Sequence, residues 1–283
     1  MLFRSYKYTE IPSPVVDNHM ISCYIDETGK PWFLDATAEF QSIMSAPPSI
    51  QGKECLVGID SVTYKVFTVP YSTDFIEQHM TVDLNGATLN IQTLQNLTGR
   101  FRQRFAYANA NKTIEEKRRA FERALASDGF AKSAVERVEH SDLHAVDDTL
   151  KVTALYRLTD YAIVSSGMIY LKMFLNVPSN EFIDPDKRRL DFELNARHEF
   201  RWTQTIKIPE GYHVEFIPEQ VNIEHPLFAF SAKATSDDDN NIIITAFYKT
   251  DFSALPRTDF EAWNEMNNRI RQFCNQSIVF KKN

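Results

Sequence analysis

Apolar and polar residues alternate along much of the chain, which is the pattern of β-strands with one buried face. The clearest alternation is TLNIQTL at 88–94 and FAFSAKAT at 228–235, and IIITAFYK at 242–249 is a nearly continuous apolar segment. Turn segments such as PEGY and SDDDNN separate neighbouring strands. By the same criteria we expect strands at 62–69, 80–84, 100–107, 134–139, 149–157, 168–175, 200–208 and 213–217.

Two segments change to the helical period. Thr113 and Glu116 form a T-x-x-E capping box, and a helix is expected over 114–127, ending before Gly129. Thr258 begins a second helix with the same box. Both helices are interpreted as covers on a sheet. The buried stripe of the second is expected to consist of Phe260, Trp263, Met266, Ile270 and Phe273.

The predicted fold class is therefore α+β and mainly β, with antiparallel sheets and two covering helices. A proline-containing segment, SAPPSIQGKE, and a polar link, PSNEFIDPDKRR, interrupt the pattern. They divide the chain into 1–60, a central β-rich segment at 61–178, and a β-sandwich-like C-terminal domain at 179–283 that carries the second helix. The closing SIVFKK, at 277–282, is expected to add an edge strand.

Composition and charge narrow the functional classes. The 283 residues include 38 acidic and 31 basic ones, a formal charge of −7, so nucleic acid is not an expected partner. Arg100, Arg102 and Arg104 alternate with Phe101, Gln103 and Phe105 and are expected on the solvated face of a strand. The glycine-rich signatures of dinucleotide and P-loop sites are absent, and no cofactor is expected. No apolar run is long enough to span a bilayer, and MLFRSYKYTEIP lacks the apolar region of a signal peptide.

Two polar clusters resemble metal sites only superficially. Asp237–Asp239 lacks the ligand spacing of a calcium loop and is interpreted as a hairpin tip. His140 and His144, with Asp142 and Asp147, are interpreted as a polar loop because no regular element is predicted to hold them. No metal site is expected.

His19 and Asp35 are the candidate catalytic pair. The segment 18–37 is predicted to form a hairpin, with HMISCYI and PWFLDAT on either side of the turn DETGK. A register centred on Glu27 would make the two residues direct cross-strand partners, with Cβ atoms about 4.5 to 5.5 Å apart. A carboxylate at that distance fixes the tautomer of a histidine that acts as a general base.

At these residues the chain resembles the transglutaminase-like family, whose domain has a papain-like cysteine fold. The likeness rests on Asn18 and His19, the strand MISCYI, the turn with Gly29, and WFLDAT at 32–37. It implies that His19 is the general base and Asp35 its orienting acid in acyl transfer or amide hydrolysis. The segment IPEGYHVEFIPEQVNI, the SAKAT hairpin and the final helix resemble the β-rich C-terminal extension of bacterial cell-envelope members. That extension has no assigned activity, and the resemblance implies the periplasm or cell envelope.

The nucleophile of the family is missing from the expected place. The family's cysteine stands on a helix upstream of the histidine, and no cysteine precedes His19 here. Cys23 shares the face of His19 by parity, but four residues of strand span about 13 Å, too far for a thiolate and imidazolium pair. Cys55 and Cys274 are interpreted as small buried residues. We therefore expect a C-terminal fragment of a transglutaminase-like cell-envelope protein, inactive alone, whose partner is the upstream remainder of that domain.

Two alternatives stay open. One is a non-catalytic β-rich module that binds or scaffolds a protein, peptide or glycan, with edge strands near 228–230 and 242–248 as candidates for strand addition. The other is a pseudoenzyme that keeps the histidine and aspartate for structural reasons. A helix-borne cysteine and a signal peptide encoded upstream of Met1 would favour the fragment over the module.

Overall fold

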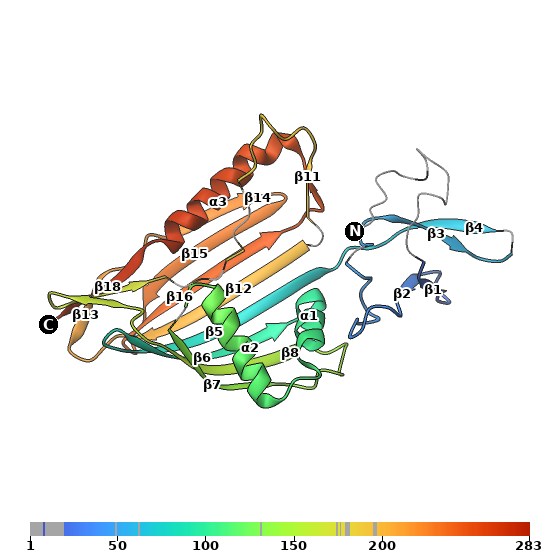
Figure 1. Ribbon diagram of the computed structural model, residues 1–283. Helices are drawn as coiled ribbons and strands as arrows, with labels where there is room; N and C mark the ends of the chain where they lie inside the picture. The colour runs from blue at the N-terminus through green and yellow to red at the C-terminus, as the bar shows by residue number, and fades with distance from the viewer. Residues whose placement is uncertain are drawn as a thin grey trace.

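The computed structural model describes residues 8, 20–48, 50–61, 63–130, 132–173, 175, 177–178, 182–194 and 197–283. It confirms the mainly β, α+β fold class. A long twisted sheet forms the body of the molecule, and two N-terminal hairpins lie beyond one end of it (Figure 1). His19 is not among the described residues.

The main sheet contains strands from both sides of the polar link. Its neighbours pair antiparallel, except that β12 and β5 are parallel. The expected parts 61–178 and 179–283 therefore share one sheet. In spatial order the strands are β14 (Val221–His225), β15 (Phe228–Ser236), β16 (Asn241–Thr250), β12 (Arg197–Lys207), β5 (Thr73–Asn85), β6 (Thr88–Leu97), β8 (Leu150–Leu158) and β7 (Ser133–His140).

This strand order changes two expectations about edges. The prediction that β15 and β16 are candidates for strand addition is wrong, because each of them has a strand on both sides. The closing strand β18 (Ser277–Lys282) is also interior, since it pairs with both β10 and β13 in a second sheet. The second sheet has the order β13 (Tyr212–Phe216), β18, β10 (Met168–Lys172) and β9 (Ile163–Ser165). The short pairs are β1 (Ser22–Ile25) with β2 (Pro31–Leu34), β3 (Glu54–Gly58) with β4 (Tyr64–Thr68), and β11 (Phe192–Glu193) with β17 (Ala254–Leu255).

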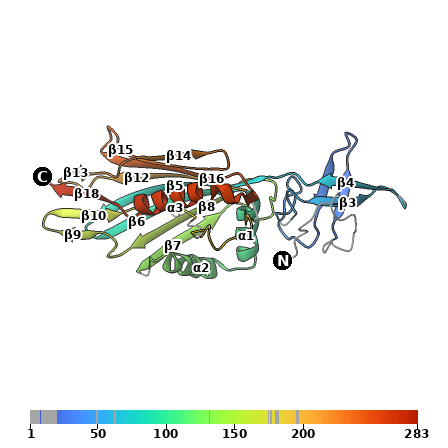
Figure 2. The same cartoon turned by 90° about the horizontal axis from the view of Figure 1, so that it is seen from above.

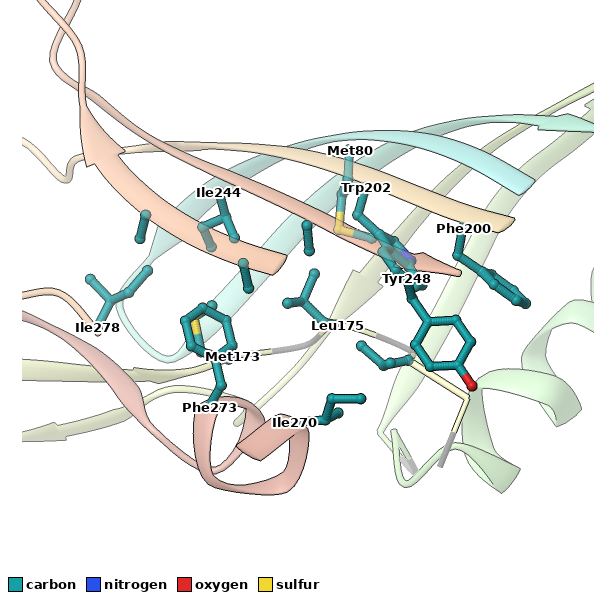
Figure 3. Packing of buried hydrophobic residues seen from close by; sticks show 14 of the residues in the cluster. Met80, Met173, Leu175, Phe200, Trp202, Ile244, Tyr248, Ile270, Phe273 and Ile278 are labelled. Carbon is teal, nitrogen blue, oxygen red and sulfur yellow. The ribbon is translucent and has the colours of Figure 1, made fainter. Parts of the chain in front are cut away.

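The helices of the described chain are α1 (Gly99–Asn109), α2 (Ile114–Ser127) and α3 (Phe260–Cys274), with a short 3-10 turn, η2 (Arg257–Asp259), before α3. Figure 2 shows them beside the main sheet in the view from above. Buried residues alternate with exposed ones along the sheet strands, and the core lies between one sheet face, α3 and the second sheet. Figure 3 shows part of this cluster, with Met80, Met173, Leu175, Phe200, Trp202, Ile244, Tyr248, Ile270, Phe273 and Ile278 labelled.

The strand expected at 100–107 is wrong, because this segment belongs to α1. Phe101 and Phe105 are four residues apart, and so are the buried Arg102 and Ala106, so the sequence fits the helical period as well as a period of two. Gly99, with φ 51°, turns the chain out of β6. An added Cβ there would lie 1.9 Å from the Oδ1 atom of Asp74, so a side chain at this position is excluded.

The helix α2 has the expected capping box, whereas α3 does not. Thr113 and Glu116 form both reciprocal hydrogen bonds of the box. The box expected at Thr258 is wrong, since residues 257–259 form a 3-10 turn and α3 starts at Phe260 without a side-chain cap. The expected buried stripe of α3 is confirmed at all of its positions, namely Phe260, Trp263, Met266, Ile270 and Phe273.

Tyr71 joins the N-terminal hairpins to the main sheet. Its hydroxyl donates to Oγ of Ser253 at 2.7 Å, and the guanidinium of Arg197 lies 4.0 Å from its ring centroid. Gly52, with φ 74°, lies against the ring, where an added Cβ would be 1.8 Å from the hydroxyl oxygen. The hairpins have a small core of their own, made of Phe33, Ala46, Val57 and Val69.

Arg102 is a buried structural residue, contrary to the solvated position expected for it. Only 3% of it is exposed. Its Nε donates to the carbonyl of Asp148 at 3.1 Å, and its Nη atoms donate to the carbonyls of Phe40 at 3.4 Å and Leu143 at 2.9 Å. One guanidinium thus connects α1 with two loops that come from distant parts of the chain.

Replacing Arg102 with methionine is expected to lower the free energy of unfolding by about 2 to 4 kcal/mol, because buried carbonyl groups lose their donor. Arg104→Met is the matched control, since Arg104 is exposed on the same helix. Urea denaturation followed by circular dichroism measures both variants. Equal loss of stability in the two would contradict the structural role of Arg102.

Candidate functional site

Of the predicted catalytic pair, His19 and Asp35, the structure describes only Asp35. Asp35 follows β2, and its Oδ1 accepts hydrogen bonds from the backbone N–H of Thr37 at 3.0 Å and from the Thr37 hydroxyl at 2.6 Å. Asp35 therefore closes a turn at the end of the hairpin. His19 lies outside the described residues, so its relation to Asp35 stays a prediction.

The hairpin itself is present, but its register differs from the one that pairs positions 19 and 35. Ser22 is opposite Leu34 and Ile25 is opposite Pro31, which centres the ladder on residue 28. The register centred on Glu27 is therefore wrong. The physical reason is the turn: Oδ1 of Asp26 accepts from the backbone N–H groups of residues 28 and 30, and Oδ2 accepts from the indole of residue 32.

The Cys23 thiol near the hairpins is not activated. Cys23 and Cys55 both pack against the small core of the N-terminal hairpins. Burial raises the pKa of the Cys23 thiol, while a hydrogen bond with the Trp32 backbone acts in the opposite direction. A raised pKa disfavours the thiolate, which is the nucleophilic form.

A partly buried ionic cluster that sequence analysis missed lies at the start of α1. Asp74 on β5, 2% exposed, pairs in register with His198 on β12, and Arg100 lies between them. Nε of Arg100 is 3.9 Å from Oδ2 of Asp74, and a guanidinium N–H of Arg100 donates to Nε2 of His198. The imidazole accepts at Nε2, so it is neutral with its proton on Nδ1. Gly99 was the sequence signal for this cluster, because its lack of a side chain makes room for Asp74.

Burial sets the protonation of this cluster. Desolvation, followed by the charge of Arg100, lowers the pKa of His198 to about 4 from an ordinary 6.5. Desolvation raises the pKa of Asp74, while the Arg100 backbone N–H and the Arg100 charge act in the opposite direction. The rings of Phe101 and Phe200 pack against His198, at centroid distances of 5.5 and 6.3 Å. The cluster therefore anchors α1 to the ends of two strands.

His198 makes stability depend on pH. In the unfolded chain it binds a proton below about pH 6.5, and in the folded protein only below about pH 4. Stability is thus expected to fall by up to about 3 kcal/mol as the pH drops from 7 to below 4. The loss is expected to be smaller in His198→Gln, whose amide oxygen still accepts from Arg100. Asp74, with its raised pKa, contributes the opposite slope in both proteins. Equal pH profiles from denaturant titrations would contradict this assignment.

A cavity of about 770 Å³ lies between the inner face of the main sheet and α2. Its volume is in the range of small-molecule sites. The floor comes from β5, β6 and β8, one end from the last turn of α1, and the roof from α2. Figure 1 shows α2 in front of the β6 to β7 side of the sheet. Apolar lining residues include Met80, Phe121, Leu125, Leu158, Met173 and Leu175.

Polar side chains interrupt the apolar floor of this cavity. Gln78 on β5 and Gln95 on β6 are direct cross-strand partners, and Thr93, only 3% exposed, lies two residues before Gln95. In the part of the chain that the structure describes, none of these three side chains forms a hydrogen bond to another residue. Gln78 and Gln95 are half-buried and line the cavity, so their amide groups and the Thr93 hydroxyl are available to a bound ligand or water. Polar residues at inward positions of apolar strands were the signal that sequence analysis did not use.

Lysines lie at the rim. Lys112, Lys117 and Lys172 line the cavity. Nζ of Lys117 is 2.7 Å from Nε2 of His140, and Nδ1 of that histidine is 2.8 Å from the carbonyl of Ser141. A carbonyl accepts only, so Nδ1 carries the proton and Nε2 accepts from the ammonium group. His140 thus orients Lys117.

The other end of the cavity is formed by Phe130, Tyr161 and Cys274. Burial raises the pKa of Tyr161, and it raises the pKa of Cys274 to about 11 although the charge of Lys172 acts in the opposite direction. The Cys274 thiol is therefore protonated at neutral pH, which disfavours a role as nucleophile.

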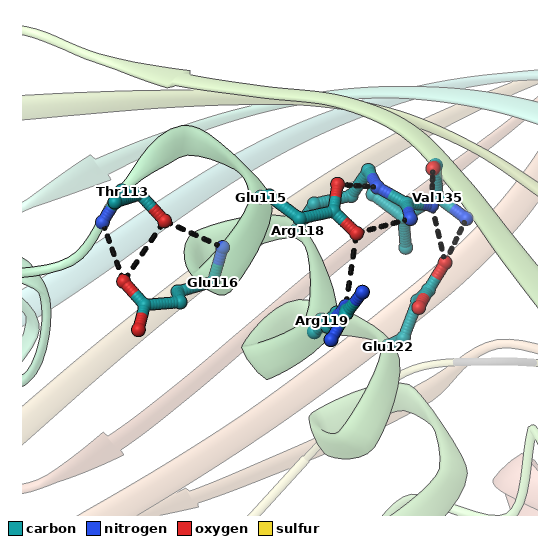
Figure 4. Close-up of polar contacts among 7 residues, drawn as sticks. All are labelled: Thr113, Glu115, Glu116, Arg118, Arg119, Glu122 and Val135. Carbon is teal, nitrogen blue, oxygen red and sulfur yellow. Dashed lines mark hydrogen bonds and ion pairs between the residues drawn. The ribbon is translucent and has the colours of Figure 1, made fainter.

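Polar contacts fasten α2 to the edge strand β7 (Figure 4). Nη1 of Arg118 donates to Oε1 of Glu122 and to the carbonyl of Val135, both at 3.0 Å. The backbone N–H of Val135 donates to the same Glu122 oxygen at 3.1 Å. Arg118 also forms an ion pair with Glu115. The helix is thus held at the edge of the sheet by polar groups, while its apolar stripe faces the cavity.

The cluster interpreted as a hairpin tip has that role, whereas the polar loop is right for Asp142, His144 and Asp147 and wrong for His140, which is the last residue of β7. Asp237 accepts from the backbone N–H groups of Asp239 and Asn241 between β15 and β16. His140 contacts Lys117, and His144 packs on Phe40 at a centroid distance of 5.5 Å. Within the described ranges, no group of three or more His, Cys, Asp or Glu side chains is placed to hold a metal ion. No helix in the same ranges is long and apolar enough to cross a membrane.

Comparison with known proteins finds a family match for part of the chain and no activity. Residues 167–280 match a family described as a domain of unknown function with solved structure, DUF3858. The matched residues run from β10 to β18 and include α3. A search among curated proteins found no match. Any function must therefore be argued from the site.

Proposed function

We propose that the described part of the chain is a non-catalytic binding module whose ligand site is the cavity beneath α2. The observation that supports this most is the floor of Gln78, Thr93 and Gln95, polar side chains that face an apolar cavity without a hydrogen-bond partner among the described residues. A ligand that offers both apolar surface and a hydrogen-bonding group would satisfy them.

The chemistry of the lining favours binding over reaction. The thiol of Cys274 has a raised pKa, so its thiolate is scarce at neutral pH. Lys117 is held as a hydrogen-bond donor, because its Nζ donates to Nε2 of His140. Such groups can recognise and orient a ligand, whereas nucleophilic attack by Cys274 requires its thiolate.

Filling the cavity is expected to abolish ligand binding. In Ala120→Trp the indole would occupy space beneath α2, because Ala120 lines the cavity. The neutral fluorescent probe N-phenylnaphthylamine is expected to bind the wild type and to lose at least about tenfold in affinity in this variant. Ala126→Trp, at an exposed position of the same helix, is the control and is expected to bind like the wild type. Equal binding by all three proteins would contradict the proposed site.

We also propose that the chain derives from a transglutaminase-like protein and has no transglutaminase or amidase turnover alone. The proposal rests on the sequence resemblance around His19 and Asp35. It is supported by the presence of the β1 and β2 hairpin and by the position of Asp35 directly after β2. The match to a family of unknown function also falls on the segment that resembles the C-terminal extension of transglutaminase-like proteins.

Assays with simple acyl donors and amine acceptors are expected to show no turnover by the wild type. Asp35→Ala is expected to cost about 1 kcal/mol of stability, because two hydrogen bonds of the turn are lost. Wild-type turnover that disappears in Asp35→Ala would contradict the inactive state and indicate a complete site. Turnover that survives His19→Ala would instead remove the histidine and aspartate from the chemistry.

A further inference from the structure

We propose that the cavity takes an anionic amphiphile, an unbranched apolar chain whose anionic headgroup lies at the α1 end against Lys112 and Lys117. This inference rests on the proposed function, because it requires the cavity to be a ligand site. It adds the class of ligand and the direction in which it lies.

The strand register gathers the polar floor at the α1 end. Gln78 is opposite Gln95, Gln95 is opposite Val152, and Val152 is opposite His140, so these residues form one row across β5, β6, β8 and β7. β6 ends at Leu97, two residues beyond Gln95, and the chain continues into α1. The amide groups of the floor therefore lie beside the end of the cavity that α1 closes.

The same end carries two cationic groups. Lys112 stands in the connection between α1 and α2, and Lys117 lies in the first turns of α2, above His140 of the polar row. Lys117 uses one of its three N–H donors on His140, and two remain for a ligand. A carboxylate or phosphate oxygen is the acceptor that pairs best with an ammonium donor.

The opposite end has balanced charge. Among the described residues that line the cavity, the one carboxyl group is Asp128, eleven residues beyond Lys117 in the sequence. At the rise of an α-helix this separation is about 16 Å. Lys172 lines that end too, next to Tyr161, whose hydroxyl donates to the Lys172 carbonyl. That end of the lining thus has one positive and one negative group. The α1 end of the lining has two positive groups, and Glu116, which is near Lys112, does not line the cavity.

The middle of the cavity suits an apolar chain. Phe121 and Leu125 of α2 lie above Met80 and Leu158 of the sheet, and Met173 and Leu175 close the side. An acyl chain would bury its surface along this stretch, which is the main source of affinity for such a ligand. A polar end, an apolar middle and cations at one end together distinguish an amphiphile from a fully apolar or a fully polar ligand.

The experiment compares dodecanoate with dodecanol, two ligands with the same chain and different headgroups, by displacement of N-phenylnaphthylamine below micelle-forming concentrations. The wild type is expected to bind dodecanoate about tenfold more tightly than dodecanol, because only the carboxylate gains a charge-assisted hydrogen bond. The double variant Lys112→Gln and Lys117→Gln is expected to lose this preference and to keep its affinity for dodecanol. Lys132→Gln is the control, since Lys132 pairs with Asp160 and does not line the cavity.

Each outcome decides a separate point. Equal affinity for the two ligands in the wild type, or a preference that survives in the double variant, would overturn the headgroup assignment while the probe still demonstrates a binding site. Binding of the probe without displacement by either ligand would overturn the amphiphile class. Failure of the probe itself to bind would contradict the proposed function. Thermal unfolding of each variant shows that the comparison is made between folded proteins.

Discussion

The parallel pairing of β5 with β12 holds the two halves of the molecule together. Residues 73–83 lie beside 197–207, and this is the one junction in the described main sheet where the central strands meet the C-terminal strands. Because these segments are far apart in the chain, the pairing closes a long loop and is expected to form late in folding. If the two halves were separated at the polar link, β5 and β12 would each have an unpaired edge. The halves are therefore partners in a single sheet rather than separable domains.

The same junction organises both polar sites. β5 begins with Asp74, which belongs to the ionic cluster, and continues to Gln78 in the cavity floor. β12 supplies His198 to the ionic cluster, and its Trp202 is the register partner of Gln78. Two strands thus connect the anchoring of α1 with the shape of the cavity that α1 closes. The buried guanidinium of Arg102 completes this arrangement by fixing the outer side of the same helix.

Sequence pattern was sufficient where one physical signal dominated. The strands at 88–94 and 228–235 alternate cleanly, and the capping box at Thr113 has a defined hydrogen-bond pattern. It failed for α1, because FRQRFA satisfies both a period of two and the helical period, and only the position of β6 decides between them. The register of the first hairpin depends on the turn that the side chain of Asp26 stabilises. The alternation of apolar and polar residues does not predict these hydrogen bonds.

The candidate site was less accessible to sequence analysis than the fold, because its residues meet through pairing between distant strands. Gln78, Gln95 and His140 form a row only once the order of β5, β6, β8 and β7 is known.

Tyr71 has a comparable long-range role at the other end of the molecule. Two-stranded hairpins with a core of only a few side chains are marginal by themselves. The N-terminal hairpins are therefore held to the large sheet through Tyr71 with Arg197 and through the segment after β2, where Arg102 and Gln103 donate to the carbonyls of Phe40 and Glu39. Whatever the hairpins face in a larger assembly is presented at an angle that these contacts set.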